Sequence, residues 1–471
     1  MDLVNKKIVV VGLGSSGVAT AQFLRNRGAA VTATDVAAES DLSPAALSLR
    51  ERGVHLELGG HQLKTFETAD LVVTSPGVPH TAAPLSHARS HSTTVMGEME
   101  LAARFVKEPI VAITGTNGKT TTTTLVGEML TRSGFNVFVG GNIGTPLISY
   151  VDRNEKAHIV VVEVSSFQLD TIDRFHANVA VLLNIAEDHL DRYPDIDTYA
   201  RSKARIFNNQ GPDDVAVINC SDTRIAALTA GLAARRFSFS RNVTGRCESV
   251  AQGAVITENA IVFDPRIVNG MQPADVSESL ASEKTVIPFS AIKLFGRHNQ
   301  ENTAAAALAV FAAGGNMTGI KAALKGFAGL QHRLEFVATV GGVRFYNDSK
   351  ATNVDAVVRA LESFSEPVVL LLGGRNKGGD FTILADSVRR GVKHLILFGE
   401  ARNEIDAALN GIVSAVFAQS MAEMVAKAVE ISATGDVVLF SPGCASFDMY
   451  ENYARRGVDF RRCVEKLKKA A

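Results

Sequence analysis

The sequence predicts an α/β protein of three successive domains, each built around a largely parallel sheet. Short apolar runs alternate with helical patterns, as in KIVVVG (7–12), VTATD (31–35) and DLVVTSPG (70–77), which is typical of strands joined by crossover helices. The pattern restarts twice, at PIVAIT (109–114) and at GVRFYND (342–348). The length of 471 residues also fits several domains of roughly 100–200 residues each. We therefore place domains at 1–97, 98–329 and 330–471.

Composition excludes several classes of partner. Lys and Arg number 48 against 49 Asp and Glu, so nothing indicates a nucleic-acid or anionic-membrane partner. No stretch reaches the ~18 apolar residues that a membrane helix needs. The first residues enter a strand pattern directly and lack a targeting signal, and the four cysteines form no CxxC pair. We expect a cytoplasmic monomer.

A nucleotide-binding turn is predicted in the first domain. Residues 12–17 read GLGSSG, a GxGxxG pattern after a strand and before a helix, and Asp35 ends the next strand. This pattern gives a tight turn and a helix N-terminus that favours a diphosphate, while the carboxylate can accept hydrogen bonds from a ribose or base. The residues alone leave open NAD(P), another nucleotide, or a structural relic.

A phosphate loop is predicted at the start of the second domain. Residues 114–120 read TGTNGKT between an apolar strand and a helical pattern. The end matches a Walker A loop, but Ile113 stands where a complete one would have glycine. Backbone N–H groups of such a loop cradle phosphates, Lys119 would meet the outer phosphates, and the Thr120 hydroxyl can ligate Mg²⁺. The alternative is a glycine-rich turn with an exposed lysine.

Two polar residues follow the next strands of this domain. Glu163 ends HIVVVEV (158–164), and His189 follows VAVLLNI (179–185). The carboxyl ends of parallel strands face the ligand crevice, so both are candidate ligands, with a structural role as the alternative for each. From its local sequence, Lys203 looks like an ordinary solvated lysine. In the stretch 245–290, GAVITENAIVF (253–263) predicts a hairpin, and the remainder is polar and predicts a surface excursion.

Seven segments together resemble the motifs of the Mur ligase family, in the family's order and over nearly the whole chain. They are TGTNGKT (114–120), EVSSFQL (163–169), NIAEDHLDRY (184–193), GRHNQEN (296–302), His332-Arg333, NDSKATN (347–353) and SPGCASFD (441–448). EVSSFQL, DSKATN and SPGCASFD resemble most closely the member that adds D-glutamate.

The resemblance implies both an architecture and a reaction. It implies a Rossmann-like UDP-binding domain, a central P-loop-type ATPase domain and a C-terminal Rossmann-like domain that binds the amino acid and part of the nucleotide. The implied enzyme is an ADP-forming carboxylate–amine ligase of peptidoglycan precursor synthesis. It would use ATP to add D-glutamate to UDP-N-acetylmuramoyl-L-alanine through an acyl phosphate. The alternatives are another Mur-type or folylpolyglutamate-type ligase, or a nicotinamide-dependent oxidoreductase.

The resemblance also implies three groups of binding residues. UDP-substrate contacts would come from Gly14, Ser15, Ser16, Gly17, Asp35, Ser75, Pro76, Gly77 and Asn142. ATP contacts would come from Gly115, Thr116, Asn117, Gly118, Lys119, Thr120, Thr121, Asn299, Asn302, Arg333 and Asp348. D-glutamate contacts would come from His189, Thr352, Lys377, Ser446, Phe447 and Tyr453.

Four residues carry the implied catalysis: Lys119, Glu163, His189 and Lys203. Glu163 and His189 resemble the ligands of one Mg²⁺. Thr120 and Lys203 resemble those of a second, with Lys203 bearing a carbamate formed from CO₂. A carbamate turns a cation into a carboxylate-like oxygen ligand, which suits Mg²⁺.

Overall fold

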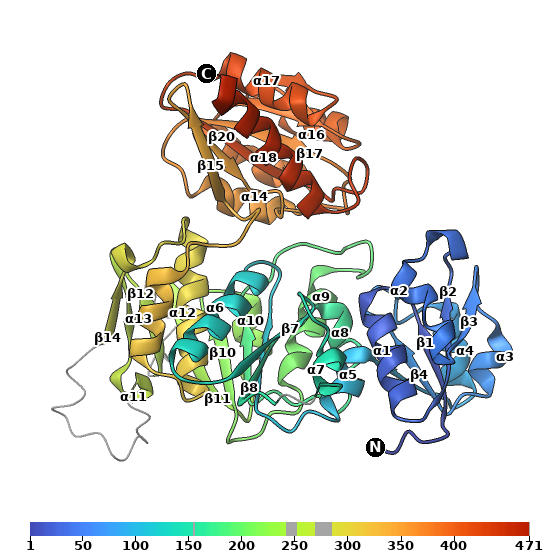
Figure 1. Ribbon diagram of the computed structural model, residues 1–471. Coiled ribbons are helices and arrows are strands. Elements are labelled where there is room, and N and C mark those ends of the chain that lie inside the picture. Colours follow the sequence, from blue (N-terminus) through green and yellow to red (C-terminus); the bar gives the residue numbers. More distant parts are fainter. Residues whose placement is uncertain (154–155, 242–251, 269–284, 471) are drawn as a thin grey trace.

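The α/β class predicted from the sequence is confirmed by a computed structural model that describes residues 1–153, 156–241, 252–268 and 285–470. Three sheets follow one another along the chain, and each is covered by helices (Figure 1). In Figure 1 the N-terminal domain lies beside the middle domain, and the C-terminal domain rests on top of the middle domain. The divisions that we propose near residues 97 and 329 fall between these sheets.

The N-terminal sheet is parallel, with strand order β3-β2-β1-β4-β5. Its strands are Lys7–Val11 (β1), Ala30–Asp35 (β2), His55–Leu58 (β3), Leu71–Thr74 (β4) and Thr94–Gly97 (β5). Its helices are Ser15–Asn26 (α1), Pro44–Leu47 (α2), Leu63–Glu67 (α3) and Ala83–Ser90 (α4). The order reverses between β1 and β4, and a crevice forms at the carboxyl ends of the strands at such a point. The GxGxxG turn lies there, and a Cβ on Gly17 would come 1.8 Å from the Gly12 carbonyl oxygen.

The middle sheet has nine strands in the order β14-β13-β12-β11-β10-β9-β6-β8-β7. They are Ile110–Thr114 (β6), Val137–Gly141 (β7), Ile159–Glu163 (β8), Val179–Leu182 (β9), Val215–Asn219 (β10), Arg235–Arg241 (β11), Gly253–Ile256 (β12), Ala260–Phe263 (β13) and Thr285–Pro288 (β14). Strands β6 to β12 pair in parallel with one another, whereas β13 pairs antiparallel with β12 and β14 antiparallel with β13. The predicted hairpin is confirmed as β12 and β13, while residues 245–251 and 269–284 of the predicted excursion lie outside the described residues.

An alanine-rich helix fills one face of the middle domain. The helices here are Glu98–Ala103 (α5), Lys119–Arg132 (α6), Leu147–Val151 (α7), Ser166–Leu169 (α8), Ile196–Ala204 (α9), Thr223–Leu228 (α10), Pro265–Val268 (α11), Arg297–Ala312 (α12) and Met317–Gly326 (α13). Residues 303–310 of α12 are all buried, because small side chains let it lie against the sheet and α6 at once. This packing holds the start of α6, where the phosphate loop ends.

The C-terminal sheet has six strands in the order β15-β16-β20-β17-β18-β19, and only β15 is antiparallel. They are Glu335–Val340 (β15), Val343–Asn347 (β16), Val368–Gly373 (β17), Val392–Phe398 (β18), Ala415–Phe417 (β19) and Val437–Gly443 (β20). The helices are Val354–Leu361 (α14), Ala385–Gly391 (α15), Arg402–Leu409 (α16), Met421–Ile431 (α17) and Tyr453–Ala470 (α18).

One apolar core continues from the N-terminal domain into the middle domain. It joins Phe23 of α1 to Ile148 of α7 and Val162 of β8. The buried core of the C-terminal domain is separate and begins at Leu334. Among the helices that the structure describes, none combines the length and apolarity needed to cross a membrane.

Candidate functional site

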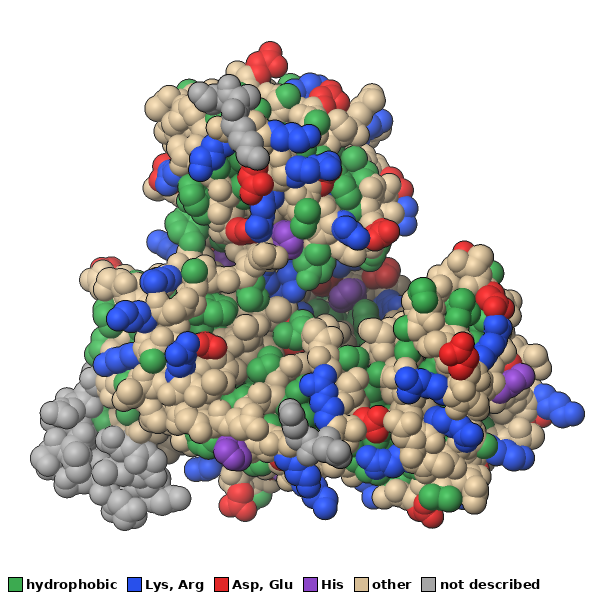
Figure 2. Space-filling model, viewed as in Figure 1, with side chains coloured by type: hydrophobic (Ala, Val, Ile, Leu, Met, Phe, Trp, Pro, Cys, Tyr) green, Lys and Arg blue, Asp and Glu red, His purple; other side chains and the backbone are tan. Residues whose placement is uncertain are grey.

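Many of the predicted site residues lie at or just after the carboxyl ends of strands in the three sheets, and others, such as Asn299 and Lys203, lie on helices. Figure 2 shows a hollow between the C-terminal domain and the other two domains, where charged and histidine side chains gather. Three cavities open along this region. Parallel strands bring residues that are distant in sequence to one edge of a sheet, which explains why single motifs could not show the arrangement.

The first cavity lies between the GxGxxG turn and the loops after β4 and β7, and has a volume of about 610 Å³. Eight of the predicted UDP-substrate residues line it: Gly14, Ser15, Ser16, Asp35, Ser75, Pro76, Gly77 and Asn142. Gly17 does not, since it packs beneath the turn. His61 and Gln168 also line the cavity. The sequence analysis missed both, because neither belongs to the nucleotide-binding pattern.

Two of these residues also hold the turn together. The Asp35 carboxylate accepts hydrogen bonds from the backbone N–H groups of Leu13 (2.7 Å) and Ala37 (2.9 Å). The Ser75 hydroxyl donates to the Gly12 carbonyl oxygen at 2.9 Å. Each carboxylate oxygen has a second lone pair, so Asp35 can still accept a hydrogen bond from a ligand while fixing the turn.

The phosphate loop depends on glycine at two positions. Gly115 has φ +152° and Gly118 has φ +86°, and a Cβ on Gly118 would come 2.3 Å from Oδ1 of Asn302. The Lys119 ammonium donates to the carbonyl oxygens of Gly115 (2.9 Å) and Thr116 (2.8 Å). It therefore lies over the loop, where phosphates would replace these carbonyls as its partners. Burial lowers the pKa of Lys119, and the carboxylates of Glu163 and Asp188 counteract this effect.

A narrow cleft separates the phosphate loop and α12 from the C-terminal domain. Seven of the predicted ATP-binding residues line it: Asn117, Gly118, Thr121, Asn299, Asn302, Arg333 and Asp348. Burial raises the pKa of Asp348 to about 7. His298, Lys350 and Arg359 line the same cleft, and the sequence analysis did not single them out.

Side chains of the C-terminal domain contact the phosphate loop directly. The Thr120 hydroxyl oxygen accepts hydrogen bonds from Nζ of Lys350 (2.9 Å) and from Arg333 (3.1 Å). The Asn117 amide donates to the Asp355 carboxylate at 2.7 Å. The hydroxyl oxygen that is predicted to ligate Mg²⁺ therefore already accepts hydrogen bonds from two basic side chains.

The residues present fit a divalent cation beside this loop. Glu163 is buried at the end of β8, and its Oε1 accepts a hydrogen bond from the Asn142 amide at 2.9 Å. Its Oε2 is also buried, and among the described residues no donor reaches it. A buried carboxylate oxygen without a partner costs free energy, and a cation would satisfy it.

Burial lowers the pKa of both His189 and Lys203, which favours the neutral form of each side chain. Burial lowers the pKa of His189 to about 4, so its imidazole is neutral at neutral pH, as metal binding requires. Lys203 on α9 is only 1% exposed, and its Nζ lies 4.6 Å from the centre of the Tyr199 ring. Burial and the nearby Lys119 charge lower its pKa well below the usual value. The interpretation as a solvated lysine is wrong, because packing of α9 buries this side chain.

The predicted D-glutamate residues divide into two groups. Thr352 and Lys377 line a small pocket with Asp188, and Nζ of Lys377 lies 2.7 Å from Oδ1 of Asp188. Four predicted residues do not line this pocket: His189, Ser446, Phe447 and Tyr453. Phe447 is 65% exposed, so the D-glutamate role of this second group stays a prediction.

Comparison with known proteins identifies the family. The Mur ligase MurD-like N-terminal domain model matches residues 6–97, the Mur ligase middle domain model matches 113–310, and the Mur ligase glutamate ligase domain model matches 332–444. The chain belongs to the Mur ligase family. These three matches account for the GxGxxG turn, the phosphate loop and the C-terminal motifs as parts of one enzyme.

Two curated relatives match this Mur ligase over its whole length. A protein of Desulfosudis oleivorans is 52% identical over 464 residues, which is 98% of this chain and 97% of the relative. A protein of Desulfatibacillum aliphaticivorans is 48% identical over 467 residues, 99% of this chain and 100% of the relative. Each is named UDP-N-acetylmuramoylalanine--D-glutamate ligase.

A solved structure supports the fold of the Mur ligase. The pseudomurein peptide ligase type C from Methanothermus fervidus superposes with a TM-score of 0.61 at 20% identity. The match covers 98% of this chain and 100% of the other, so the three-domain order is common to both.

Proposed function

We propose that this Mur ligase uses ATP to join D-glutamate to UDP-N-acetylmuramoyl-L-alanine, with release of ADP and phosphate. Full-length relatives with that activity in their names support the choice of substrates. The contact between Asn142 and Glu163 carries the structural argument. Asn142 lines the cavity assigned to UDP, and Glu163 lies at the phosphate loop. A substrate that extends past Asn142 would therefore bring its carboxylate to the γ-phosphate.

The reaction has two balanced steps. A carboxylate oxygen of the substrate attacks the γ-phosphorus, and the bond to the bridging oxygen breaks, which gives an acyl phosphate and ADP. The D-glutamate amine then attacks the acyl carbon, the C–O bond to phosphate breaks, and the nitrogen loses a proton. Lys119 and Arg333 would neutralise the charge that develops on the transferred phosphoryl group.

We propose that Glu163 and His189 hold one Mg²⁺ in this site, and that Thr120 contributes its hydroxyl to a second. Two observations support the first ion: no donor among the described residues reaches Oε2 of Glu163, and the imidazole of His189 is neutral. When bound, Mg²⁺ supplies positive charge that stabilises the transferring phosphoryl group. Arg333 and Lys350 would have to leave the Thr120 oxygen to make room for the second ion.

We also propose that Lys203 carries a carbamate. A neutral lysine amine attacks CO₂, an N–C bond forms, and a proton is released. The low pKa of the buried Lys203 supplies the neutral amine, and the new carboxylate would turn a buried cation into an oxygen ligand for a second Mg²⁺. Because the reaction consumes ATP, we propose that it takes place in the cytoplasm.

Two measurements test the proposed function. Phosphate release from ATP should require both UDP-N-acetylmuramoyl-L-alanine and D-glutamate within a panel of amino acids. Preference for another amino acid would favour another ligase of the family. Calorimetry should show binding of the UDP substrate and none of NADPH, and the reverse result would favour the oxidoreductase alternative.

A further inference from the structure

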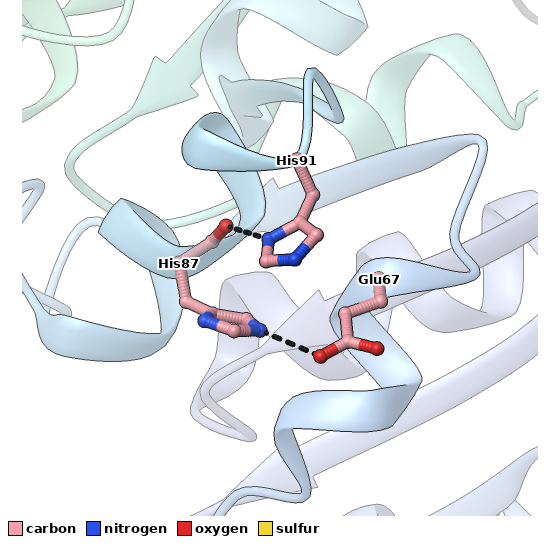
Figure 3. A group of neighbouring side chains, drawn as sticks. All are labelled: Glu67, His87 and His91. Carbon is pink, nitrogen blue, oxygen red and sulfur yellow. Dashed lines mark hydrogen bonds and ion pairs between the residues drawn. The ribbon is translucent and has the colours of Figure 1, made fainter.

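A cluster of metal-ligand side chains lies on the N-terminal domain, apart from the ligase site. Within the parts of the chain that the structure describes, it is the one group of at least three His, Cys, Asp or Glu residues close enough to share an ion. Its members are Glu67, His87 and His91, and their ligand atoms all lie within 4.8 Å of one another (Figure 3). None of the three lines the cavity assigned to UDP or the nucleotide cleft.

The two histidines lie on one face of α4. They are four residues apart, with His91 as the C-cap of the helix, and this spacing stacks side chains on one face. Nδ1 of His91 lies 3.0 Å from the His87 carbonyl oxygen. A proton on Nδ1 donates to this carbonyl and leaves Nε2 with its lone pair. Metal-binding histidines commonly use a backbone carbonyl in this way to fix the tautomer and the ring orientation.

The carboxylate comes from the neighbouring helix. Glu67 is the last residue of α3, and its Oε1 lies 3.0 Å from Nε2 of His87 (Figure 3). These two atoms share a hydrogen bond, and a metal ion bound between them would take the place of the shared proton. The side chains project into solvent and remain accessible, since Glu67 and His91 are exposed and His87 is half-buried.

Buried residues fix the two helices that carry the cluster. Phe66 and Leu85 are fully buried in one apolar cluster, and the Thr93 hydroxyl donates to the Phe66 carbonyl oxygen at 3.2 Å. Ligand atoms on a tetrahedral zinc ion lie about 3.4 Å apart. Rotation of three surface side chains can close the remaining gap, so the backbone need not move.

We propose that Glu67, His87 and His91 bind one transition-metal ion of the Zn²⁺ class, with water as the remaining ligand. Two imidazoles and one carboxylate favour Zn²⁺ over Mg²⁺, which prefers oxygen ligands. The ion would link α3 to α4 and stabilise the N-terminal domain, because binding to the folded state alone raises stability. This site is independent of the ligase reaction.

Calorimetric titration of the metal-stripped full chain with Zn²⁺, in excess Mg²⁺, tests the proposal. Wild type should bind one equivalent more than His87→Ala or His91→Ala, and Glu67→Gln should weaken this binding at least about tenfold. His55→Ala is the matched control, because His55 is an exposed histidine of the same domain outside the cluster. Zn²⁺ should also raise the Tm of wild type and of His55→Ala. In the presence of Zn²⁺, the Tm of His91→Ala should remain below both.

Equal Zn²⁺ stoichiometry and affinity in wild type and both histidine variants would overturn the proposal. Such a result would assign any bound zinc to other ligands, such as Glu163 and His189. Turnover of ATP in the same variants provides a separate measure of the ligase site. The metal site and the proposed function can therefore fail independently.

Discussion

Lys377, in the loop after β17, forms an ion pair with Asp188, in the loop after β9, with 2.7 Å between Nζ and Oδ1. The Asn353 amide of the C-terminal domain donates to the other oxygen of Asp188 at 3.1 Å. Burial opposes ionisation here, but the charge of Lys377 and the hydrogen bonds from Lys377 and Asn353 help to lower the pKa of Asp188 to about 2. The middle and C-terminal domains therefore meet at a fixed anion beside the pocket that we assign to D-glutamate.

Lys377→Ala should raise the KM for D-glutamate far more than the KM for ATP. The substitution removes the cation expected to face a substrate carboxylate. Loss of such a charged hydrogen bond costs about 1–3 kcal/mol, or roughly 5–150-fold in apparent affinity. Steady-state kinetics with each substrate varied in turn measures the difference. Lys393→Ala, which removes a cation paired with Asp436 in the same domain, should change neither constant, and equal effects of Lys377→Ala on both KM values would exclude Lys377 from the pocket.

Lys119→Ala should abolish ATP turnover while binding of the UDP substrate survives. Lys119 donates within the phosphate loop, whereas the cavity assigned to UDP is lined by other residues. Phosphate release measures turnover, and calorimetry measures binding of the UDP substrate. The exposed Lys325 provides a control, since Lys325→Ala should keep full activity. Near-normal turnover by Lys119→Ala would reject the phosphate-loop assignment.

Lys203→Ala should be nearly inactive, and formate or acetate should restore part of the activity. A small carboxylate can fill the space and replace the oxygen ligand that a carbamate would provide. Lys119→Ala is the control, because it removes a cation and should not respond to these acids. Intact-protein mass and wild-type activity at low and high bicarbonate give a second readout. Full activity of wild type in CO₂-free buffer would contradict the carbamate.

Glu98→Gln should stabilise the protein at pH 8 and have little effect near pH 5. Burial raises the pKa of Glu98 to about 7 in the folded state, against about 4.3 in an unfolded chain. The folded state holds the extra proton, so the stability of wild type falls as the pH rises from about 4.5 to 7. The shift corresponds to about 4 kcal/mol at most.

Urea unfolding at the two pH values measures this effect. Glutamine mimics the protonated acid and can still accept the Ile148 N–H hydrogen bond. Glu128→Gln, which alters an exposed pair with Arg132, should change stability equally at both pH values. Equal destabilisation by Glu98→Gln at pH 5 and pH 8 would indicate that Glu98 is ionised in the folded protein.

The strands that build the site could be predicted from the sequence, because long apolar runs such as those of β6, β8 and β17 can only be buried. Short or mixed strands were missed: His55–Leu58 of β3 and Ala415–Phe417 of β19 carry too few apolar residues to be recognised. The antiparallel strand β15 precedes GVRFYND (342–348), the first apolar run that the sequence analysis assigns to the C-terminal domain, and was not predicted.

The site was less predictable than the fold. The burial of Lys203 depends on how α9 packs against α8 and α10, and local sequence favoured the opposite environment. Lys350 lies two residues after the predicted Asp348, yet its contact with Thr120 exists only because two domains meet. Contacts of this kind arise from tertiary structure and have no periodic pattern in the sequence.

The separate core of the C-terminal domain has a thermodynamic consequence. Its buried apolar residues begin at Leu334, and Phe295 makes the main aromatic contact with it from outside, against Tyr346 and Phe364. The contacts between this domain and the phosphate loop, by contrast, include hydrogen bonds of Arg333, Lys350 and Asp355. Separation of the domain would expose little apolar surface, so we expect it to proceed with a small change in heat capacity and a marked dependence on ionic strength.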